Sequence, residues 1–336
     1  MPDAPSADPR LDTLRAWVAS TLATRAFSLA PASSDASFRR YFRVHRGAPG
    51  AASLIAMDAP PGREDCRPFV HVAGLLVDAG VHAPQIAASD VERGFVLMSD
   101  LGDRTYADVL DEASADRLYL DALDALVLWQ RSTREGVLPE YGDALLRREL
   151  ALFPDWYLAR HIAVTPTPAE REALAATFDL LVANNLAQPR VFVHRDYHSR
   201  NLMHCAPNPG VLDFQDAVIG PVTYDLVSLL RDAYVAWPEE RELDWAIRYW
   251  ERARAAGLPV GADFAGFFRD YEWMGMQRQL KVLGIFARLA HRDGKDRYVA
   301  DMPRVAGYLR RAASRYREFD PLRRALDALE ARARRG

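Results

Sequence analysis

HRDYHSRNLMHCAPNPGVLDFQD, at residues 194–216, is the stretch that most strongly constrains the fold. Two short segments in it, 201–204 and 210–213, are joined by a turn that contains two prolines and ends at Gly210. Because such residues favour turns, we predict that the two segments pair as a β-hairpin. That pairing would place Asn201 and Asp213 opposite each other at the open end of the hairpin.

Three oxygen-bearing side chains are therefore expected to meet at this end of the hairpin. Asp196 precedes Asn201 by five residues, on the loop that leads to the same end. A carboxylate and an amide oxygen suit Mg²⁺, so Asn201 and Asp213 are predicted to be metal ligands. Asp196 can then accept the proton of an attacking hydroxyl group. This division of roles, at this spacing, is the pattern of a kinase catalytic loop.

One further carboxylate is predicted to support the loop. Asp225 lies at the expected start of a helix that follows the hairpin. At such a position it can accept hydrogen bonds from backbone N–H groups of the loop, or pair with Arg195. The sequence leaves both alternatives open.

The composition is that of an ordinary globular protein. The chain has 336 residues, of which 49% are apolar and 26% charged, and its formal net charge is −3. This length favours two lobes or domains that share an interface. We expect no nucleic-acid partner, because no basic stripe interleaved with aromatic residues is present. Cys66 and Cys205 lie far apart and lack a metal-binding spacing, which argues against a disulfide framework or a zinc site.

The cellular location is inferred from the lack of targeting signals. Residues 1–10 contain no basic start followed by an apolar stretch, and no window reaches about 18 uninterrupted apolar residues. We therefore expect no signal peptide, no membrane association and a cytoplasmic location.

The pattern of apolar residues changes along the chain. The elements expected before residue 100 are a helix at 11–29, strands within 38–44, 53–57 and 95–98, and a helix at 64–79. An antiparallel sheet with one helix would account for residues 31–98. Beyond residue 101 the periodicity is mostly helical, apart from the hairpin region. We predict an α+β fold with a small β lobe followed by a larger helical lobe.

These residues resemble those of the aminoglycoside phosphotransferase family, and the resemblance covers nearly the whole chain. Within that family the sequence is most similar to the bacterial kinases that phosphorylate the anomeric C1 hydroxyl of N-acetylmuramate and N-acetylglucosamine in peptidoglycan recycling. The stretches that carry the resemblance are 37–43, 57–61, 101–103, 194–201, 213–217 and 273–288. The resemblance implies a protein-kinase-like fold, ATP and Mg²⁺ as cofactors, and an amino sugar as substrate.

The resemblance also implies lobe boundaries and roles for residues. The lobes would be a nucleotide-binding lobe at 1–98, a hinge at 99–102, and a catalytic and substrate-binding lobe at 103–336. Asp196 would be the catalytic base, with Asn201 and Asp213 as metal ligands. The adenine would pair with the hinge at Ser99, Asp100 and Leu101, and a loop containing Ser34 and Ser37 would cover the phosphates.

Two departures from the kinase pattern concern the phosphates. The chain has no G-x-G-x-x-G loop, and Ala56, Met57 and Asp58 stand where the fold normally places a strand lysine. We expect Met57 to lie at the nucleotide site, and Arg39 or Arg43 to hold the phosphates in place of the lysine.

The expected sugar site lies on the helix around residues 272–288. Trp273, Gln277 and Lys281 recur every four residues and would line one face. Trp273 could stack on a sugar ring, and Gln277, Arg278 or Lys281 could bind an acetamido oxygen or the lactyl carboxylate of muramic acid. Alternatively, Trp273 belongs to the core and the cations are solvated. Further candidates for substrate contact are His198, Gln215 and Asp216.

Two other functions remain open at this point. A kinase of the same fold could act on an aminoglycoside or on an amino alcohol of the choline or homoserine type. A regulator that binds nucleotide without turnover is a different class, suggested by the missing lysine. Whichever of these functions is correct, we expect the protein to be a monomer.

Overall fold

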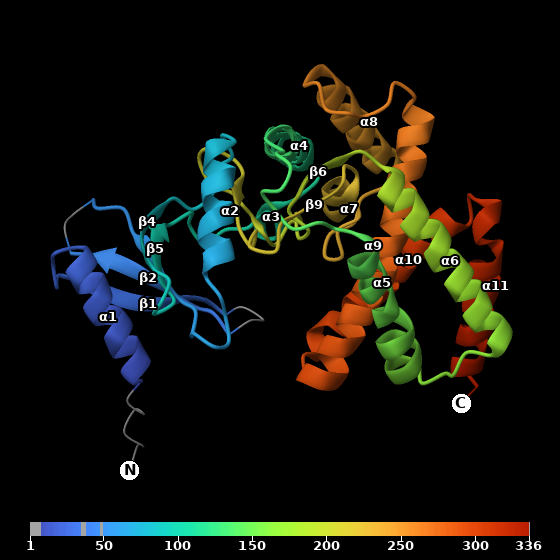
Figure 1. Ribbon diagram of the computed structural model, residues 1–336, viewed down its shortest axis with the longest axis horizontal. Helices are drawn as coiled ribbons and strands as arrows, with labels where there is room; N and C mark the ends of the chain where they lie inside the picture. The colour runs from blue at the N-terminus through green and yellow to red at the C-terminus, as the bar shows by residue number, and fades with distance from the viewer. Residues whose placement is uncertain (1–7, 35–37, 48–49, 336) are drawn as a thin grey trace, which may run out of the picture. The chain divides into compact units, whose positions relative to one another are not determined.

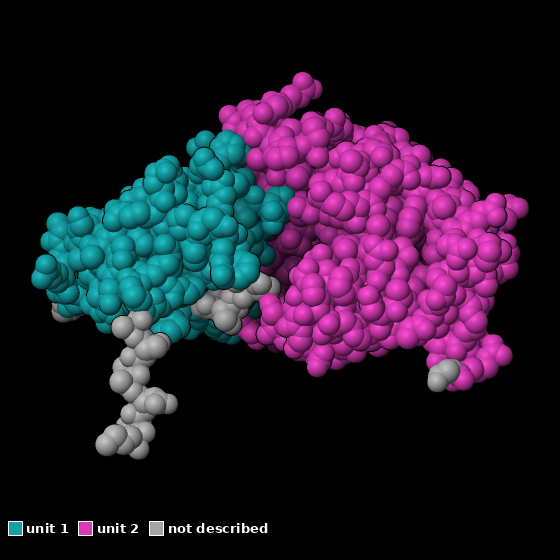
Figure 2. All heavy atoms as spheres, turned by 60° about the horizontal axis from the view of Figure 1, so that its bottom comes forward, with its two compact units in different colours: residues 1–105, 203–216 teal, residues 106–202, 217–336 magenta. Residues whose placement is uncertain are grey.

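The computed structural model describes residues 8–34, 38–47 and 50–335. Contacts within the chain divide it into two compact units, which are coloured separately in Figure 2. Unit 1 comprises residues 1–105 and 203–216, and unit 2 comprises residues 106–202 and 217–336. The hairpin segment 203–216 thus belongs with the N-terminal unit, whereas the sequence prediction assigned it to the C-terminal lobe. The hinge at 99–102 stays a prediction.

Unit 1 is built on an antiparallel sheet of five strands in the order β1-β2-β3-β5-β4 (Figure 1). Its elements are α1 (Pro9–Thr21), β1 (Phe27–Ser34), β2 (Arg40–Arg46), β3 (Leu54–Asp58), α2 (Arg67–Asp78), β4 (Ile86–Asp90) and β5 (Phe95–Ser99). The predicted strands β2, β3 and β5 and the predicted helix α2 are confirmed. The helix predicted at 11–29 is wrong in its second half, because residues 27–34 pair with β2 instead.

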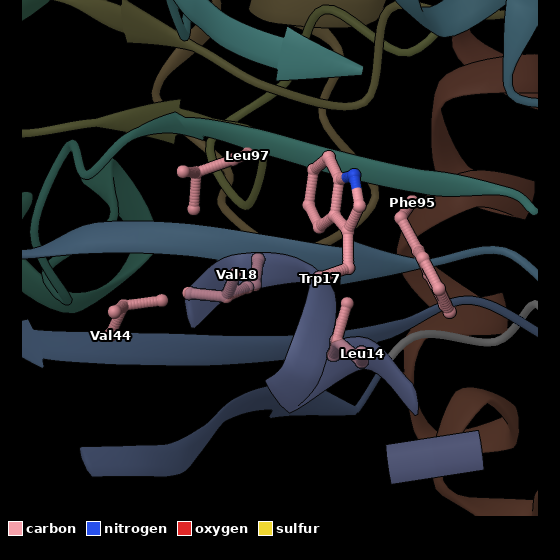
Figure 3. Packing of buried hydrophobic residues seen from close by; sticks show 7 residues of the cluster. Leu14, Trp17, Val18, Val44, Phe95 and Leu97 are labelled. Atoms are coloured by element: carbon pink, nitrogen blue, oxygen red, sulfur yellow. The ribbon is translucent and has the colours of Figure 1, made fainter. Parts of the chain in front are cut away.

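One face of this sheet is covered by α1. Alternate residues of a strand point to opposite faces, and Val44, Ala56 and Leu97 share the face that α1 covers. Leu14 and Trp17 of α1 pack against them (Figure 3), and Trp17 also contacts the ring of Phe95 at a centroid distance of 5.7 Å. Burial of this apolar surface attaches the helix to the sheet.

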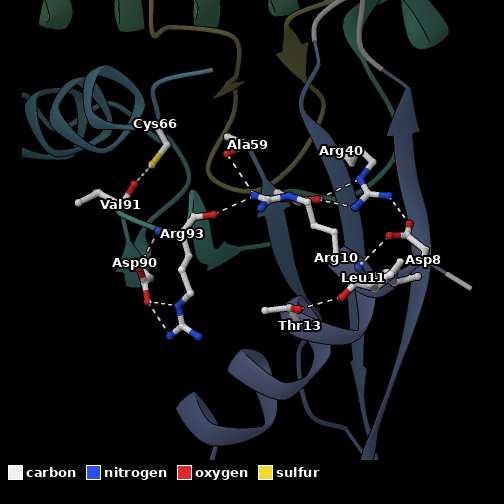
Figure 4. Close-up of polar contacts among 12 residues, drawn as sticks. Asp8, Arg10, Leu11, Thr13, Arg40, Ala59, Cys66, Asp90, Val91 and Arg93 are labelled. Carbon is white, nitrogen blue, oxygen red and sulfur yellow. Dashed lines mark hydrogen bonds and ion pairs between the residues drawn. The ribbon is translucent and has the colours of Figure 1, made fainter. Parts of the chain in front are cut away.

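An ion-pair cluster at the end of β3 adds to this attachment. The Asp58 side chain is fully buried, and its Oδ1 accepts a hydrogen bond of 2.7 Å from Nε of Arg10 on α1. Its Oδ2 accepts hydrogen bonds of 3.0 and 2.6 Å from Arg40 (Figure 4). A buried carboxylate is tolerated only when it is paired in this way. Asp58, near the position where a kinase lysine was expected, therefore stabilises the contact between α1 and the sheet.

Unit 2 is mainly helical. Its helices are α3 (Tyr106–Val109), α4 (Ala115–Arg131), α5 (Asp143–Leu152), η1 (Phe153–His161), α6 (Pro168–Ala187), α7 (Tyr224–Leu230), α8 (Glu239–Ala255), α9 (Phe264–Asp293), η2 (Asp296–Asp301), α10 (Met302–Ala313), η3 (Arg317–Phe319) and α11 (Asp320–Ala333). Two short strands, β6 (Arg190–Val193) and β9 (Val218–Pro221), pair antiparallel within it. The predicted hairpin is confirmed, because β7 (Leu202–Met203) pairs with β8 (Gly210–Val211). The predicted α+β fold, with an antiparallel sheet in the N-terminal part and a mainly helical remainder, is confirmed as well.

Helix α9, with 30 residues, forms the centre of unit 2 and contacts α5, η1, α6, α7 and α10 (Figure 1). Residues 271–284 of this helix are all buried. At Gly284 the backbone at the end of α5 comes so close that a Cβ atom on residue 284 would lie 2.4 Å from the carbonyl carbon of Leu152. Glu272, also on α9, forms an ion pair of 3.0 Å with the buried Arg231, which directly follows α7.

Within the described part of the chain, no helix is both long enough and apolar enough to span a lipid bilayer.

The start of α6 provides a prediction about pH and stability. Thr167 and Glu170 form a capping box, and Glu170 also pairs with Arg332 of α11 at 2.6 Å. The hydrogen bond from Arg332 is the main reason that the pKa of Glu170 is lowered to about 2. Because the folded state favours the ionised carboxylate, its contribution is complete above the unfolded pKa of about 4.5 and is lost as pH falls towards 2.

Glu170→Gln is therefore expected to lower the free energy of unfolding by about 1 kcal/mol at pH 7, with a smaller loss as the pH falls below about 4.5. Urea unfolding curves measured at several pH values test this. Glu172→Gln, at an exposed position of the same helix, is the control. If Glu170→Gln lowers the free energy of unfolding by the same amount at every pH, the pKa shift is wrongly assigned to Glu170.

Candidate active site

Backbone N–H groups of the predicted catalytic loop form hydrogen bonds with a side chain at the start of α7. The buried carboxylate of Asp225 accepts hydrogen bonds from the backbone N–H groups of His194 and Arg195, at 2.6 and 2.9 Å. Burial raises the pKa of Asp225 to about 7, although these two donors act in the opposite direction. Of the two alternatives for Asp225, the contact with backbone N–H groups is thus confirmed. Arg195 adopts a left-handed backbone conformation, with a φ of 77°.

Asp196 and Asn201 lie together on this loop. The side-chain Nδ2 of Asn201 donates a hydrogen bond of 2.9 Å to the backbone carbonyl of Asp196. Burial alone would raise the pKa of Asp196, but the positive charges of Lys281 and Arg278 contribute to holding it below its ordinary value. Asp196 is therefore a carboxylate at neutral pH, as a proton acceptor must be.

A pocket of about 130 Å³ lies beside Asp196 within unit 2. Its lining combines two cations with aromatic and aliphatic side chains, and consists of Asp196, His198, Ala233, Tyr234, Arg278, Lys281, Val282, Ile285, Phe286, Leu289 and Tyr298. Burial lowers the pKa of His198, so this imidazole is neutral at pH 7. The pocket can therefore hold a small polar molecule against the predicted base.

Lys281 is held in the pocket wall by a buried acidic residue. Its Nζ lies 3.0 Å from Oε1 of Glu149 on α5, and it donates a hydrogen bond of 2.8 Å to the hydroxyl of Tyr224. Glu149 also accepts a hydrogen bond of 2.6 Å from Arg195 on the catalytic loop. The sequence analysis missed Glu149, although a single acidic residue in the largely apolar run 149–153 is a signal that could have identified it.

The second half of the predicted metal site belongs to unit 1. Asp213 has a φ of 63°, and its Oδ1 accepts a hydrogen bond of 2.9 Å from Nε2 of Gln215. The ring of the neighbouring Phe214 packs against Phe69 of α2 at a centroid distance of 4.7 Å. Asn201 supplies an amide oxygen and Asp213 a carboxylate, and this donor chemistry fits Mg²⁺. Because Asn201 belongs to unit 2, their joint role as ligands remains a prediction.

The arginines predicted to bind phosphate are both close to carboxylates in unit 1. Nε of Arg43 donates a hydrogen bond of 2.6 Å to Asp100, and its NH2 group donates one of 2.8 Å to the carbonyl of Gly102. Arg43 would have to leave this ion pair to hold a phosphate, so its position favours a structural role at the predicted hinge. Nε of Arg39 lies 3.6 Å from a carboxylate oxygen of Glu64.

The other predicted nucleotide residues are also in unit 1. The N–H of Ser99 donates a hydrogen bond of 3.0 Å to the carbonyl of Gln85, so this donor is already in use, and the pairing of the hinge with adenine stays a prediction. Leu101 is buried, and Met57 is fully buried in the middle of the sheet. Ser34 lies on β1, whereas Ser37 falls outside the described residues.

Four of the predicted substrate residues lie away from the pocket lining that the structure describes. Trp273 is 3% exposed and packs edge-to-face against Phe319 at a centroid distance of 4.7 Å. Gln277 is fully buried and donates a hydrogen bond of 3.2 Å to the hydroxyl of Tyr141. Gln215 and the exposed Asp216 belong to unit 1. The position of Trp273 supports the core alternative and gives no support to sugar stacking, because its ring is enclosed by other side chains.

The chain is similar in sequence to known proteins. The family model described as the phosphotransferase enzyme family (APH) matches residues 28–264. An N-acetylmuramate/N-acetylglucosamine kinase from Pseudomonas aeruginosa is 57% identical, over 90% of this chain and 88% of that protein. Proteins of the same name from Pseudomonas putida and Neisseria meningitidis are 50% and 47% identical, over 98% and 92% of this chain and 99% and 92% of theirs.

Solved structures share the fold at much lower sequence identity. The ADP-bound aminoglycoside phosphotransferase APH(2'')-Ib is 14% identical and superposes with a TM-score of 0.57, covering 90% of this chain and 96% of that chain. The choline kinase LicA from Streptococcus pneumoniae is also 14% identical, with a TM-score of 0.59, covering 89% of this chain and 98% of that chain. Since the family model covers well over half of the sequence and the relatives cover nearly all of it, the chain belongs to the phosphotransferase enzyme family.

Proposed function

We propose that this protein is an ATP-dependent kinase that phosphorylates the anomeric C1 hydroxyl of N-acetylmuramate and N-acetylglucosamine. The names of relatives at 47% to 57% identity support the substrate class. The observation that carries the proposal is the position of Asp196, an ionised carboxylate in the wall of a pocket that also presents cationic and aromatic side chains. We place the reaction in the cytoplasm, as a step in the reuse of cell-wall sugars, and expect a monomer.

In the proposed reaction, Asp196 accepts the proton of the C1 hydroxyl. The sugar oxygen forms a bond to the γ-phosphorus of ATP, the bond from that phosphorus to the bridging oxygen breaks, and ADP leaves. The anomeric hydroxyl is more acidic than the other hydroxyls of the sugar, so a single carboxylate is a suitable base. Magnesium, held by Asn201 and Asp213, would neutralise charge on the phosphates. The hydrogen bonds that Asp225 accepts from the backbone N–H groups of the loop keep the base in position.

The choice of C1 gives a direct test. The methyl glycoside of N-acetylglucosamine keeps every other hydroxyl but blocks the anomeric one. It should give no ADP release above background, while competing weakly with the free sugar. Phosphorus NMR of the product from free N-acetylglucosamine should show coupling to the anomeric proton. Phosphorylation of the methyl glycoside at a comparable rate, or coupling to the C6 protons, would show that another hydroxyl is the acceptor.

The same assay separates the alternative functions. An aminoglycoside is a polycation, and the pocket beside Asp196 presents the cation Arg278, which would repel it. We therefore expect no ADP release with aminoglycosides or amino alcohols. A regulator without turnover would bind ATP and release no ADP with any acceptor.

A further inference from the structure

Lys281 is held in an ion pair, whereas Arg278 is in none among the described residues, although its positive charge acts on the carboxylate of Asp196 in the same pocket wall. Glu149 lies 3.0 Å from Lys281, so a carboxylate of the protein already compensates that ammonium group. Arg278 is 6% exposed, and it makes no hydrogen bond or ion pair with any residue that the structure describes. Its Nε is buried without a partner. A buried N–H donor without a partner is costly, so we expect an anion to join Arg278 during function.

The position of Arg278 indicates which kind of molecule would supply that anion. Arg278 shares the pocket wall with the predicted base, Asp196, and with the aliphatic side chains of Val282 and Ile285. In the proposed reaction the hydroxyl of the phosphate acceptor must reach Asp196, so the acceptor occupies this pocket. The anion expected here is therefore carried by the phosphate acceptor. Val282 and Ile285 offer an apolar surface to its methyl groups.

We infer that Arg278 binds the lactyl carboxylate of N-acetylmuramate and is the residue that distinguishes this acidic sugar from the uncharged N-acetylglucosamine. The inference rests on the proposed function and adds a specificity-determining residue to it. A guanidinium presents two parallel N–H donors that match the two oxygens of a carboxylate, so the contact is both strong and directional. N-acetylglucosamine lacks this group and would leave Arg278 unpaired in the complex.

The test compares the two sugars in wild type and in Arg278→Met, which keeps much of the side-chain length but removes the charge. The ratio of kcat/KM for N-acetylmuramate to kcat/KM for N-acetylglucosamine is expected to fall by about 10- to 100-fold. Any effect of Arg278 on the pKa of Asp196 acts on both sugars and cancels in this ratio. Arg278→Lys keeps the charge but loses the planar pair of donors, and should give an intermediate ratio. Arg288→Met, on the same helix but outside the described pocket lining, is the control.

A second experiment changes the substrate and keeps the wild-type enzyme, so its result does not depend on how a variant folds. The methyl ester of N-acetylmuramate keeps the lactyl group but not its charge. Wild type should lose about as much kcat/KM on the ester as Arg278→Met loses on the acid. The kcat/KM of Arg278→Met on the ester should be only slightly lower than the kcat/KM after either change alone, because both changes remove the same contact.

Two results would overturn the inference. If kcat/KM for the two sugars falls equally in Arg278→Met, Arg278 acts on the phosphoryl group or on the base. If wild type does not discriminate between N-acetylmuramate and its ester, the carboxylate has no partner in the pocket. In both cases C1 phosphorylation of N-acetylglucosamine by wild type would leave the proposed function standing. If wild type phosphorylates neither sugar, the proposed function itself fails.

Discussion

Asp196→Asn is expected to lower kcat on N-acetylglucosamine by about 100- to 10,000-fold, because an amide cannot accept the proton of the attacking hydroxyl. The substitution keeps the size of the side chain. It also keeps the backbone carbonyl that accepts the hydrogen bond from Asn201. Nucleotide binding, measured by calorimetry with ATP and magnesium, should therefore be unchanged.

The matched control is Asp155→Asn, the same substitution at an exposed position of η1. It should leave kcat unchanged. Turnover by Asp196→Asn close to that of the control would remove Asp196 from its role as the base. A loss of ATP binding together with turnover would indicate that the loop had moved, so a proton-transfer role could no longer be inferred from this variant.

Trp273→Ala is expected to destabilise the fold by about 3 to 5 kcal/mol, since truncation of a buried tryptophan leaves a cavity. The indole is enclosed by Phe319 and Tyr316, and the guanidinium of Arg269 lies 4.2 Å from its ring centroid. The KM for the sugar should remain close to the wild-type value at a temperature where the variant is folded. Urea unfolding and initial-rate kinetics on the same preparation measure both quantities.

Tyr234→Ala provides the comparison for Trp273→Ala, because Tyr234 lines the pocket beside Asp196. It should raise the KM for the sugar more than Trp273→Ala does. The reverse pattern, with a large increase in KM and little loss of stability in Trp273→Ala, would restore the stacking role that the sequence suggested.

The catalytic loop and the hairpin could be predicted because their chemistry depends on local spacing. Asp196, Asn201 and Asp213 lie within 18 consecutive residues, and the turn between them is rich in proline and glycine. Strand β1 was missed for the opposite reason. Residues 27–34 contain proline, alanine and serine, which carry little strand signal. They are ordered as a strand by pairing with β2, a contact made in the folded chain.

Periodicity alone could not identify the face of α9 that lines the pocket. On a helix that is buried all round, apolar and polar residues do not separate into an inner and an outer face. Trp273 lies about 140° around the helix from Arg278, since each residue turns it by about 100°. The predicted set therefore combined two residues of the pocket, Arg278 and Lys281, with two that lie away from its lining, Trp273 and Gln277. Glu149 was missed because its partner Lys281 is 132 residues away in the sequence.

The burial of α9 also affects how the substrate range of such an enzyme can evolve. Loops accept insertions and deletions readily, and many binding sites diverge through them. One inserted residue in α9 before Arg278 would rotate the rest of the helix by about 100°, turning Arg278 out of the pocket and Gly284 away from Leu152. Lineages that change their sugar preference at this pocket must therefore do so by substitution at the positions facing it, while the length of the helix stays fixed.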